Sequence, residues 1–334
     1  MTRSTFGRLA CARAVLLAGA ALLLASGCGH DATPLADMPQ DPDLTDPGMD
    51  NPGTDPGGVD PNAPDEILFQ QGLMAYDLGD YASAIASFEQ LLTDYPDSVR
   101  HDNAGYLIGR AQYTLQDFAA ADEALSAMLT AHPDSLFAAS ALYFRARSRF
   151  RTADLAGALP EFRAAVETDP TSVYADNAQY YIGRTLYETG DLAGAVVELQ
   201  KLATDYPDSS YRDNASYYLG RAYFEQADFP NAIASFEEVL TYTGTFYADN
   251  AYYFIARSDY EQGDLAGAMS YFQQLEAQHP GSQYIDNAIY YEVRIDVDQA
   301  DCVGANADLA RLSSQFPASP YLAQAQTYVT GGGC

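Results

Sequence analysis

Apolar and aromatic residues recur along most of the chain at three- and four-residue spacing, which indicates amphipathic helices rather than strands. In residues 211–240, YRDNASYYLGRAYFEQADFPNAIASFEEVL, one such segment is followed by a short polar break and then by a second segment. Versions of this stretch recur seven times at a spacing of 37 residues, with one interval of 36. A self-similar period of this length is typical of solenoid proteins. The pattern therefore predicts an all-α protein built from repeated helix pairs.

Each repeat carries a small anchor residue in its first helix. The anchors are Gly72, Gly109, Ala146, Gly183, Gly220 and Ala256, with Val293 in the last repeat. An alanine follows twelve residues after each anchor, from Ala84 to Ala305, and a Phe or Leu comes four residues later. Glycine inside a helix costs about 1 kcal/mol relative to alanine, so we expect the missing side chain to allow close approach of the second helix.

An aspartate precedes every second helix. These residues are Asp80, Asp117, Asp154, Asp191, Asp228, Asp264 and Asp301. Because their carboxylates can accept hydrogen bonds from the open N–H groups of the first turn, we expect seven caps worth about 1 kcal/mol each. The second helices end near proline-containing turns, except in repeat five. There residues 242–245 (YTGT) replace the turn with one residue fewer, which accounts for the 36-residue interval.

A small anchor preceded by Leu or Ile, then an alanine, an aromatic residue and a proline, resembles the tetratricopeptide repeat. Repeat five carries this pattern in Leu219-Gly220, Tyr223, Ala232 and Phe236. The leading Trp of that family is absent, and the period exceeds its usual length of about 34 residues. The resemblance implies a right-handed α-solenoid of about seven helix pairs with a C-terminal capping helix over residues 320–329.

The longer repeat units have turns such as DYPDS at residues 94–98 and 205–209. They are similar to the tetratricopeptide domains of periplasmic and outer-membrane lipoproteins. Among these are the Tol–Pal-associated coordinator of cell constriction and the helical lipoprotein of the β-barrel assembly machinery. This resemblance implies a role in the bacterial cell envelope.

The first 28 residues have the features of a secretory leader. Three arginines precede the apolar run at residues 14–25, which at about a dozen residues is too short for a transmembrane helix of roughly 20. The run ends in ASGC, which resembles a bacterial lipobox, so we expect Cys28 to be lipidated. A plain signal peptide with an incidental cysteine is the alternative. Because Gly29 is not the Asp of the inner-membrane retention signal, the resemblance favours the outer membrane and the periplasmic side over the inner membrane or the cell surface.

Residues 29–64 contain eight Asp, eight Pro, five Gly and no aromatic residue. Such a segment buries too little apolar surface to fold, so we expect a disordered acidic tether. The predicted organisation is a signal peptide (residues 1–28), a tether (29–64), a repeat domain (65–330) and a short tail (331–334).

The formal net charge is −29, and three of the 17 basic residues precede Cys28, leaving 14 against 46 acidic residues. Such a field repels nucleic acid and anionic lipid headgroups, so we expect no nucleic-acid partner and a membrane contact only through the N-terminal lipid. The sequence contains no phosphate-binding loop, no nucleophile motif and no metal-ligand spacing among its four histidines. We therefore expect no catalytic residue, metal or cofactor.

Two cysteines lie near the C-terminus. Cys302 follows the last capping aspartate, and Cys334 is the final residue. Because an exported protein meets an oxidising compartment, we predict a disulfide between them, worth roughly 3–4 kcal/mol in the chain-entropy model. The alternative is a buried thiol and a free tail.

Further columns of equivalent residues share one face of the first helices. Counted from the anchor, asparagine occurs six residues before, tyrosine three before, arginine one after and mostly aromatic residues four after. This spacing places the columns on one helix face. The candidate partner-binding residues are Asn103, Tyr106, Arg110, Tyr143, Arg147, Arg151, Asn177, Tyr180, Arg184, Asn214, Tyr217, Arg221, Asn250, Tyr253 and Arg257. The tetratricopeptide resemblance implies that they line a concave groove.

Such a groove would hold an extended peptide, with Asn binding backbone amides, Tyr binding proline or apolar side chains, and Arg binding carboxylates. We therefore predict a non-enzymatic scaffold for an envelope protein or peptide segment, in envelope biogenesis, constriction or outer-membrane assembly. Three alternatives remain. The rings pack between adjacent helices, the arginines pair with acids four residues on, as in Arg221–Glu225 or Arg294–Asp298, or the aromatic ladder holds a glycan or peptidoglycan strand.

Repeat three is unusually basic. Its first helix reads YFRARSRFR at residues 143–151, and Arg163 follows on the next helix. Neutralisation by neighbours such as Asp154 or Glu161 is one explanation. A docking spot for an acidic or C-terminal carboxylate group of a partner is the other.

Overall fold

The computed structural model describes residues 60–334, and these form fifteen α-helices and no strand. Cys28, the predicted signal peptide and all but the last five residues of the predicted tether lie outside the described residues. The first helices of the seven pairs are α1 (Pro64–Asp77), α3 (His101–Thr114), α5 (Ala138–Arg151), α7 (Ala175–Glu188), α9 (Arg212–Glu225), α11 (Ala248–Gln262) and α13 (Ile285–Asp298). The second helices are α2 (Tyr81–Asp94), α4 (Phe118–Ala131), α6 (Leu155–Thr168), α8 (Leu192–Asp205), α10 (Phe229–Thr241), α12 (Leu265–Gln278) and α14 (Cys302–Gln315). A single helix, α15 (Leu322–Gly331), follows.

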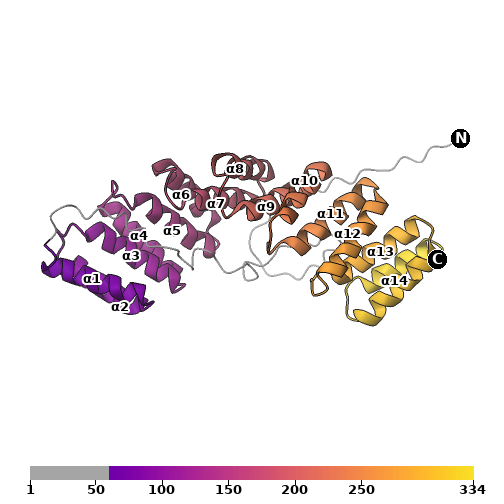
Figure 1. Cartoon of the computed structure of the whole chain (residues 1–334), viewed down its shortest axis with the longest axis horizontal. Helices are drawn as coiled ribbons and strands as arrows, with labels where there is room; N and C mark the ends of the chain where they lie inside the picture. The colour runs from indigo at the N-terminus through magenta and orange to yellow at the C-terminus, as the bar shows by residue number, and fades with distance from the viewer. Residues whose placement is uncertain (1–59) are drawn as a thin grey trace, which may run out of the picture. The chain divides into compact units, whose positions relative to one another are not determined.

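Each helix from α1 to α14 packs against the next helix in the chain, and α15 packs against both α13 and α14 (Figure 1). Several first helices also contact the next first helix directly, as α3 contacts α5 and α7 contacts α9. This neighbour-to-neighbour packing confirms the α-solenoid of seven helix pairs and a capping helix. None of the helices within residues 60–334 combines the length and the apolar character needed to cross a membrane.

The glycine anchors allow the two helices of a pair to come close together. A Cβ added to Gly220 would lie 2.8 Å from ring carbons of Phe236, and one added to Gly183 would lie 2.6 Å from Leu199. The Phe or Leu column therefore fills the space that each glycine leaves. The alanine column is completely buried beside it, from Ala84 to Ala305. The predicted packing reason for the anchors is confirmed.

The turn inside each pair combines a left-handed residue with an aspartate cap. The side chains of all seven aspartates accept from backbone N–H groups in the first turn of the second helix, as Asp191 does from Gly194 at 3.0 Å. The residue before each aspartate has a positive φ. These residues are Gly79, Gln116, Ala153, Gly190, Ala227, Gly263 and Ala300. Only glycine adopts this conformation without steric cost, so four of the seven turns carry some strain.

The turn that follows the second helix is fastened to the first helix of the same repeat. The Ser98 hydroxyl donates to the Asp65 carboxylate at 2.7 Å, and the equivalent bond recurs in the second, fifth, sixth and seventh repeats. In repeat five the donor is Thr245, which belongs to the shortened turn, and its acceptor is Asp213. The shorter turn therefore keeps the bond that fixes the connection.

The C-terminal end is closed by a disulfide between Cys302 and Cys334. Cys302 begins α14, whereas Cys334 follows α15, so the bond links the capping helix to the last pair. The predicted pairing is confirmed.

Candidate partner-binding face

The tyrosine column of the first helices forms a ladder of stacked rings. Each ring, three residues before its anchor, stacks on the aromatic residue that precedes the next first helix. The stacked pairs are Tyr106–Phe137, Tyr143–Tyr174, Tyr180–Tyr211, Tyr217–Tyr247, Tyr253–Tyr284 and Tyr290–Tyr321. Ring centroids are between 4.2 Å (Tyr217–Tyr247) and 5.5 Å (Tyr290–Tyr321) apart. The first five tyrosines are at most 1% exposed, so the ladder belongs to the packing between repeats.

The arginine column lies among aromatic rings of three successive repeats. The Arg221 guanidinium carbon lies 4.6 Å from the centroid of Phe254 in the next repeat and 5.8 Å from that of Tyr187 in the preceding one. The same arrangement recurs at Arg110, Arg147, Arg184, Arg257 and Arg294. Each such cation–π contact contributes about 0.5–2 kcal/mol, depending on its desolvation. The arginines therefore tie each repeat to both of its neighbours.

Hydrogen bonds connect the arginine, tyrosine and asparagine columns. Arg221 Nη1 donates to the Tyr217 hydroxyl at 2.9 Å, and Arg147 and Arg257 make the equivalent bond. The Tyr247 hydroxyl donates to Oδ1 of Asn214 at 3.0 Å. Oδ1 of Asn250 accepts from the Tyr284 hydroxyl in the same way. The Asn177 amide instead donates to the Tyr143 hydroxyl, and the Asn287 amide donates to the hydroxyls of Tyr253 and Tyr321. Buried polar groups need such partners, so this network allows polar columns to be buried between helices.

Ion pairs along the first helices agree with the prediction in three repeats and differ in the last. Arg184–Glu188, Arg221–Glu225 and Arg257–Glu261 are 3.7–3.8 Å apart. The expected Arg294–Asp298 pair does not form. Asp298 instead accepts from the hydroxyls of Tyr260 at 2.8 Å and Tyr328 at 2.7 Å.

In repeat three, the basic side chains divide into two groups. Arg145 and Arg149 both donate to Glu161, and Arg149 also reaches Asp122 at 2.9 Å. Neutralisation by Glu161 is thus confirmed for these two arginines. Arg147 is 1% exposed and lies 4.0 Å from the centroid of the Tyr181 ring, and Arg151 lies over Phe118.

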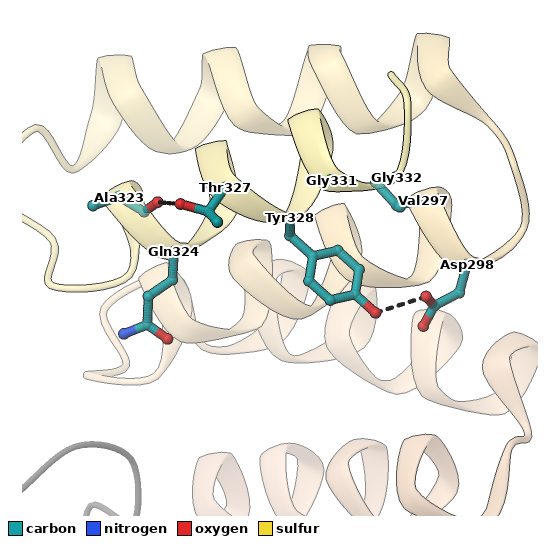
Figure 2. A pocket seen from close by; sticks show the side chains of 8 residues that line it. All are labelled: Val297, Asp298, Ala323, Gln324, Thr327, Tyr328, Gly331 and Gly332. Carbon is teal, nitrogen blue, oxygen red and sulfur yellow. Dashed lines mark hydrogen bonds between the residues drawn. The ribbon is translucent and has the colours of Figure 1, made fainter. Parts of the chain in front are cut away.

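At the C-terminal end of the first-helix face, an open hollow of about 710 Å³ lies between α13 and α15 (Figure 2). It is lined by Val297, Asp298, Ala323, Gln324, Thr327, Tyr328, Gly331 and Gly332. Figure 2 shows the Tyr328 hydroxyl directed at Asp298, with which it forms a hydrogen bond. The hollow therefore has apolar walls, one carboxylate and three uncharged polar side chains.

The hollow arises because α15 carries smaller residues than an eighth repeat would. Continuing the 37-residue period, Gln324 takes the asparagine position, Thr327 the tyrosine position and Gly331 the arginine position. Loss of a phenol ring and a guanidinium removes the side chains that fill this space elsewhere. Tyr328 keeps its place and lies 5.1 Å from the guanidinium of Arg294. The columns that are buried along the array are therefore opened at this end.

Beside this end of the array, one arginine is shared by three carboxylates. Arg311 donates to Glu292 at 3.1 Å and to Asp308 at 2.8 Å, and it also bonds to Glu276. Burial, together with the neighbouring Glu276 and Asp308 carboxylates, raises the pKa of Glu292 to about 9. This environment therefore favours the protonated form of Glu292.

Two histidines that are 31 residues apart in the sequence also lie in contact with each other. Nδ1 of His101 and Nε2 of His132 are 2.8 Å apart. Burial and the neighbouring His132 lower the pKa of His101. Within residues 60–334 there is no group of three or more His, Cys, Asp or Glu residues placed to hold a metal ion.

The predicted site residues thus form one continuous set of columns, and the structure gives their side chains packing contacts between repeats. A binding role for Asn103, Tyr106, Arg110 and the equivalent residues stays a prediction. Sequence reasoning missed the aromatic residues nine and two before the anchor, exemplified by Tyr211 and Tyr218, which make the stacks and the arginine contacts. Their recurrence at the repeat period was the signal that could have identified them.

Sequence comparisons match families to most of this array. The model of YfiO, an outer membrane lipoprotein family, matches residues 61–179, and two tetratricopeptide-repeat models match residues 177–209 and 215–283. No curated protein sequence matches the chain.

Solved structures with the same fold have low sequence identity. The C-terminal part of a tetratricopeptide-repeat protein from Cytophaga hutchinsonii is 18% identical over 77% of this chain and 98% of its own, with a TM-score of 0.63. A tetratricopeptide-repeat protein from Parabacteroides merdae is 15% identical over 80% and 98% of the two chains, with a TM-score of 0.51. PilW, a type IV pilus biogenesis factor, is 20% identical over 68% and 99%, with a TM-score of 0.51. In its fold the chain is a tetratricopeptide-like α-solenoid, and its first repeats are similar to an outer membrane lipoprotein family.

Proposed function

We propose that this protein is a lipid-anchored, non-enzymatic scaffold of the bacterial cell envelope, attached to the outer membrane through Cys28 and facing the periplasm. Two independent features support this proposal. The ASGC motif resembles a lipobox, and residues 61–179 match an outer membrane lipoprotein family. Tetratricopeptide and related repeats bind other proteins, and the processes proposed for this one are envelope biogenesis, constriction or outer-membrane assembly.

The observation that carries the proposed binding role is the hollow between α13 and α15. A partner segment is proposed to enter here and to follow the first-helix face toward the N-terminal repeats. The volume of about 710 Å³ lies within the range of about 300–1,000 Å³ that is typical of ligand pockets. Val297 and Ala323 suit an apolar side chain, whereas Gln324 and Thr327 suit the polar groups of a peptide backbone. This chemistry favours an extended protein segment.

A glycan ligand is less well supported. Sugars bind to the open faces of aromatic rings, but the tyrosine rings of the ladder stack on one another at 4.2–5.5 Å. Tyr328 is the aromatic ring that lines the hollow, and it is bonded to Asp298. A protein partner therefore remains the better assignment.

A photo-crosslinking amino acid placed at Gln324 in cells tests this assignment. We expect it to capture a discrete protein, whereas the same amino acid at Val173, an exposed turn residue, should not. Gly331→Arg would place in the hollow the side chain that other repeats carry, so it should abolish capture. Val303→Arg, at a position 83% exposed, serves as the matched control. Equal capture at residues 324 and 173, or capture that persists in Gly331→Arg, would refute the proposal.

A further inference from the structure

A pocket of about 520 Å³ lies where α2, α3 and α4 meet, and we call it the α2–α4 pocket. Its lining includes Glu89 from α2, His101, Gly105 and Gln112 from α3, and Glu123 from α4. None of the candidate partner-binding residues and none of the residues around the hollow at α15 lines it. Its volume is within the range of about 300–1,000 Å³ that is typical of small-molecule pockets. The pocket is therefore separate from the proposed partner site.

Two small residues, Gly105 of α3 and Ala124 of α4, leave this space open. Counted from the anchor, the equivalent residues of repeat six are Tyr252 and Tyr271, whose ring centroids are 6.3 Å apart. Because the helix pairs of a repeat array pack alike, the two phenol rings fill in repeat six the space that is open in repeat two. The array itself thus shows that this space accepts aromatic rings.

The groups that contact those two rings in repeat six are also present around the pocket. The Tyr271 hydroxyl donates to Glu237 at 3.4 Å, and the Tyr252 ring centroid lies 5.7 Å from that of His279. The equivalent residues at the α2–α4 pocket are Glu89, which lines it, and His132, which contacts the pocket residue His101. A ring bound in the pocket would therefore meet the same carboxylate and the same imidazole.

The polar groups of the pocket offer acceptors that no donor of the array uses. Glu89 and Glu123 form no ion pair within residues 60–334. Oε1 of Gln112 is buried and has no hydrogen-bond partner in the same part of the chain. Since a buried acceptor without a partner is costly, this oxygen favours a ligand that carries an N–H or O–H donor.

In two other repeats, a positive group takes the equivalent space. Arg149 of repeat three, at the position of Gln112, bonds to Glu161, and Arg311 of repeat seven bonds to Asp308. Repeats three and seven thus place a guanidinium among carboxylates, whereas repeat six places two rings there. The pocket of repeat two has acceptors for both kinds of group and contains neither.

We propose that the α2–α4 pocket binds a small aromatic amine. The ring takes the space beside Gly105 and Ala124, and the Glu89 and Glu123 carboxylates attract the ammonium group. A donor of the ligand satisfies Oε1 of Gln112. The formal charge of −29 raises the local concentration of cations, which favours such a ligand further. This inference is independent of the proposed partner site at the hollow.

Titration of tyramine into ¹⁵N-labelled chain from residue 28 onward, with Cys28→Ser, tests the proposal. We expect saturable shifts of amide signals in α3 and α4 and none in α11 and α12, where Tyr252 and Tyr271 fill the equivalent space. The carboxylate counterpart, 4-hydroxyphenylacetate, and hexylamine, which lacks the ring, should each bind at least about tenfold more weakly. Acetyl-Lys-Tyr-Lys amide offers the same groups on a peptide and should also bind more weakly than tyramine.

Variants locate the binding site. Glu89→Gln with Glu123→Gln should weaken tyramine binding by roughly three- to tenfold, because two exposed charge interactions are lost. Glu167→Gln with Glu237→Gln makes the same change in net charge away from the pocket and should have no effect. Ala124→Tyr supplies the ring that repeat six carries, so it should abolish the shifts.

Any of four results would overturn the proposal. They are the absence of saturable shifts in α3 and α4, equal binding of tyramine and either single-feature probe, unchanged binding in the Glu89→Gln, Glu123→Gln variant, and tighter binding of the peptide, which would assign the pocket to a protein partner. Both glutamates are exposed, so their replacement leaves the fold intact and keeps the test decisive even if Ala124→Tyr does not fold.

Discussion

Replacing Glu292 by Gln should stabilise the last repeats, although Glu292 bonds to Arg311. Glu292 is only 1% exposed, and Arg311 also bonds to Glu276 and Asp308. Three carboxylates therefore share one partly exposed guanidinium, and the Glu292 carboxylate is the buried one of the three. Gln has the same shape and keeps an oxygen that can accept from Arg311, but it carries no charge. The substitution removes an excess buried charge without opening a cavity.

The magnitude follows from the pKa. Burial and the two neighbouring carboxylates raise the pKa of Glu292 from 4.5 to about 9, and a tenfold change in proton affinity corresponds to about 1.4 kcal/mol. Because the folded pKa lies above the unfolded one, this contribution to stability is complete below pH 4.5 and is lost as the pH rises to 9. The upper limit of this contribution to the free energy of unfolding is about 6 kcal/mol. Movement of Arg311 and entry of water near the ionised carboxylate reduce it. We expect Glu292→Gln to gain about 1–3 kcal/mol near pH 9 and little near pH 4.5.

Glu161 provides a matched control with the opposite sign. It is a single carboxylate that accepts from both Arg145 and Arg149, and its side chain is 11% exposed. Glu161→Gln removes the charge that balances two guanidinium groups, so it should destabilise repeat three by about 1–3 kcal/mol near neutral pH.

Urea denaturation of the chain from residue 29, followed by circular dichroism at several pH values, gives both free energies of unfolding. Hydrogen exchange of α13 and α14 shows whether the Glu292 effect is local. If Glu292→Gln is less stable than the unsubstituted chain near pH 9, or if both substitutions act in the same direction, the charge-balance argument is wrong.

Gly220→Ala should destabilise the protein by about 1–3 kcal/mol, because its Cβ would lie 2.8 Å from the ring of Phe236. This cost exceeds the gain in helix propensity, and Gly281→Ala, which meets nothing within 4 Å, should change the urea midpoint little. Replacing Cys302 and Cys334 by Ser should cost up to roughly 3–4 kcal/mol and increase hydrogen exchange in α15 before it does so in α9. Equal midpoints for the two glycine variants, or unchanged exchange in α15, would contradict these expectations.

Features that depend on contacts within one repeat could be predicted from the sequence. The aspartate caps act on N–H groups two or three residues away, and Gly220 meets Phe236 at a fixed separation in every repeat. Periodicity showed that these residues occupy equivalent places, and their residue types indicated the contact. The positive φ of the residue before each cap could also have been predicted from the sequence, because three of the seven positions are glycine, as at Gly190.

Contacts between repeats could not be derived in the same way. Tyr211 stacks on Tyr180, 31 residues earlier, and no local rule predicts which of several aromatic columns it meets. The Arg294–Asp298 pair failed for a related reason, because hydroxyls from two other helices compete for the carboxylate. The terminal hollow exists because α15 lacks the tyrosine and the arginine that the other repeats carry. The repeat pattern alone does not show that these two side chains would have filled one common space.

The arginine contacts have a consequence for how this protein can evolve. Each column arginine lies between rings of the preceding and the following repeat, and the same residue types meet at nearly every boundary. Recombination that duplicates or deletes one whole repeat would therefore create a new boundary at which the same arginine and aromatic residues meet. Repeats three and seven are exceptions, because Arg149–Asp122 and Arg163–Glu198 join repeat three to its neighbours and Arg311–Glu276 joins repeat seven to repeat six. The number of units between these two places is free to change, so the lineage can adjust the length of the array while α15 continues to end it.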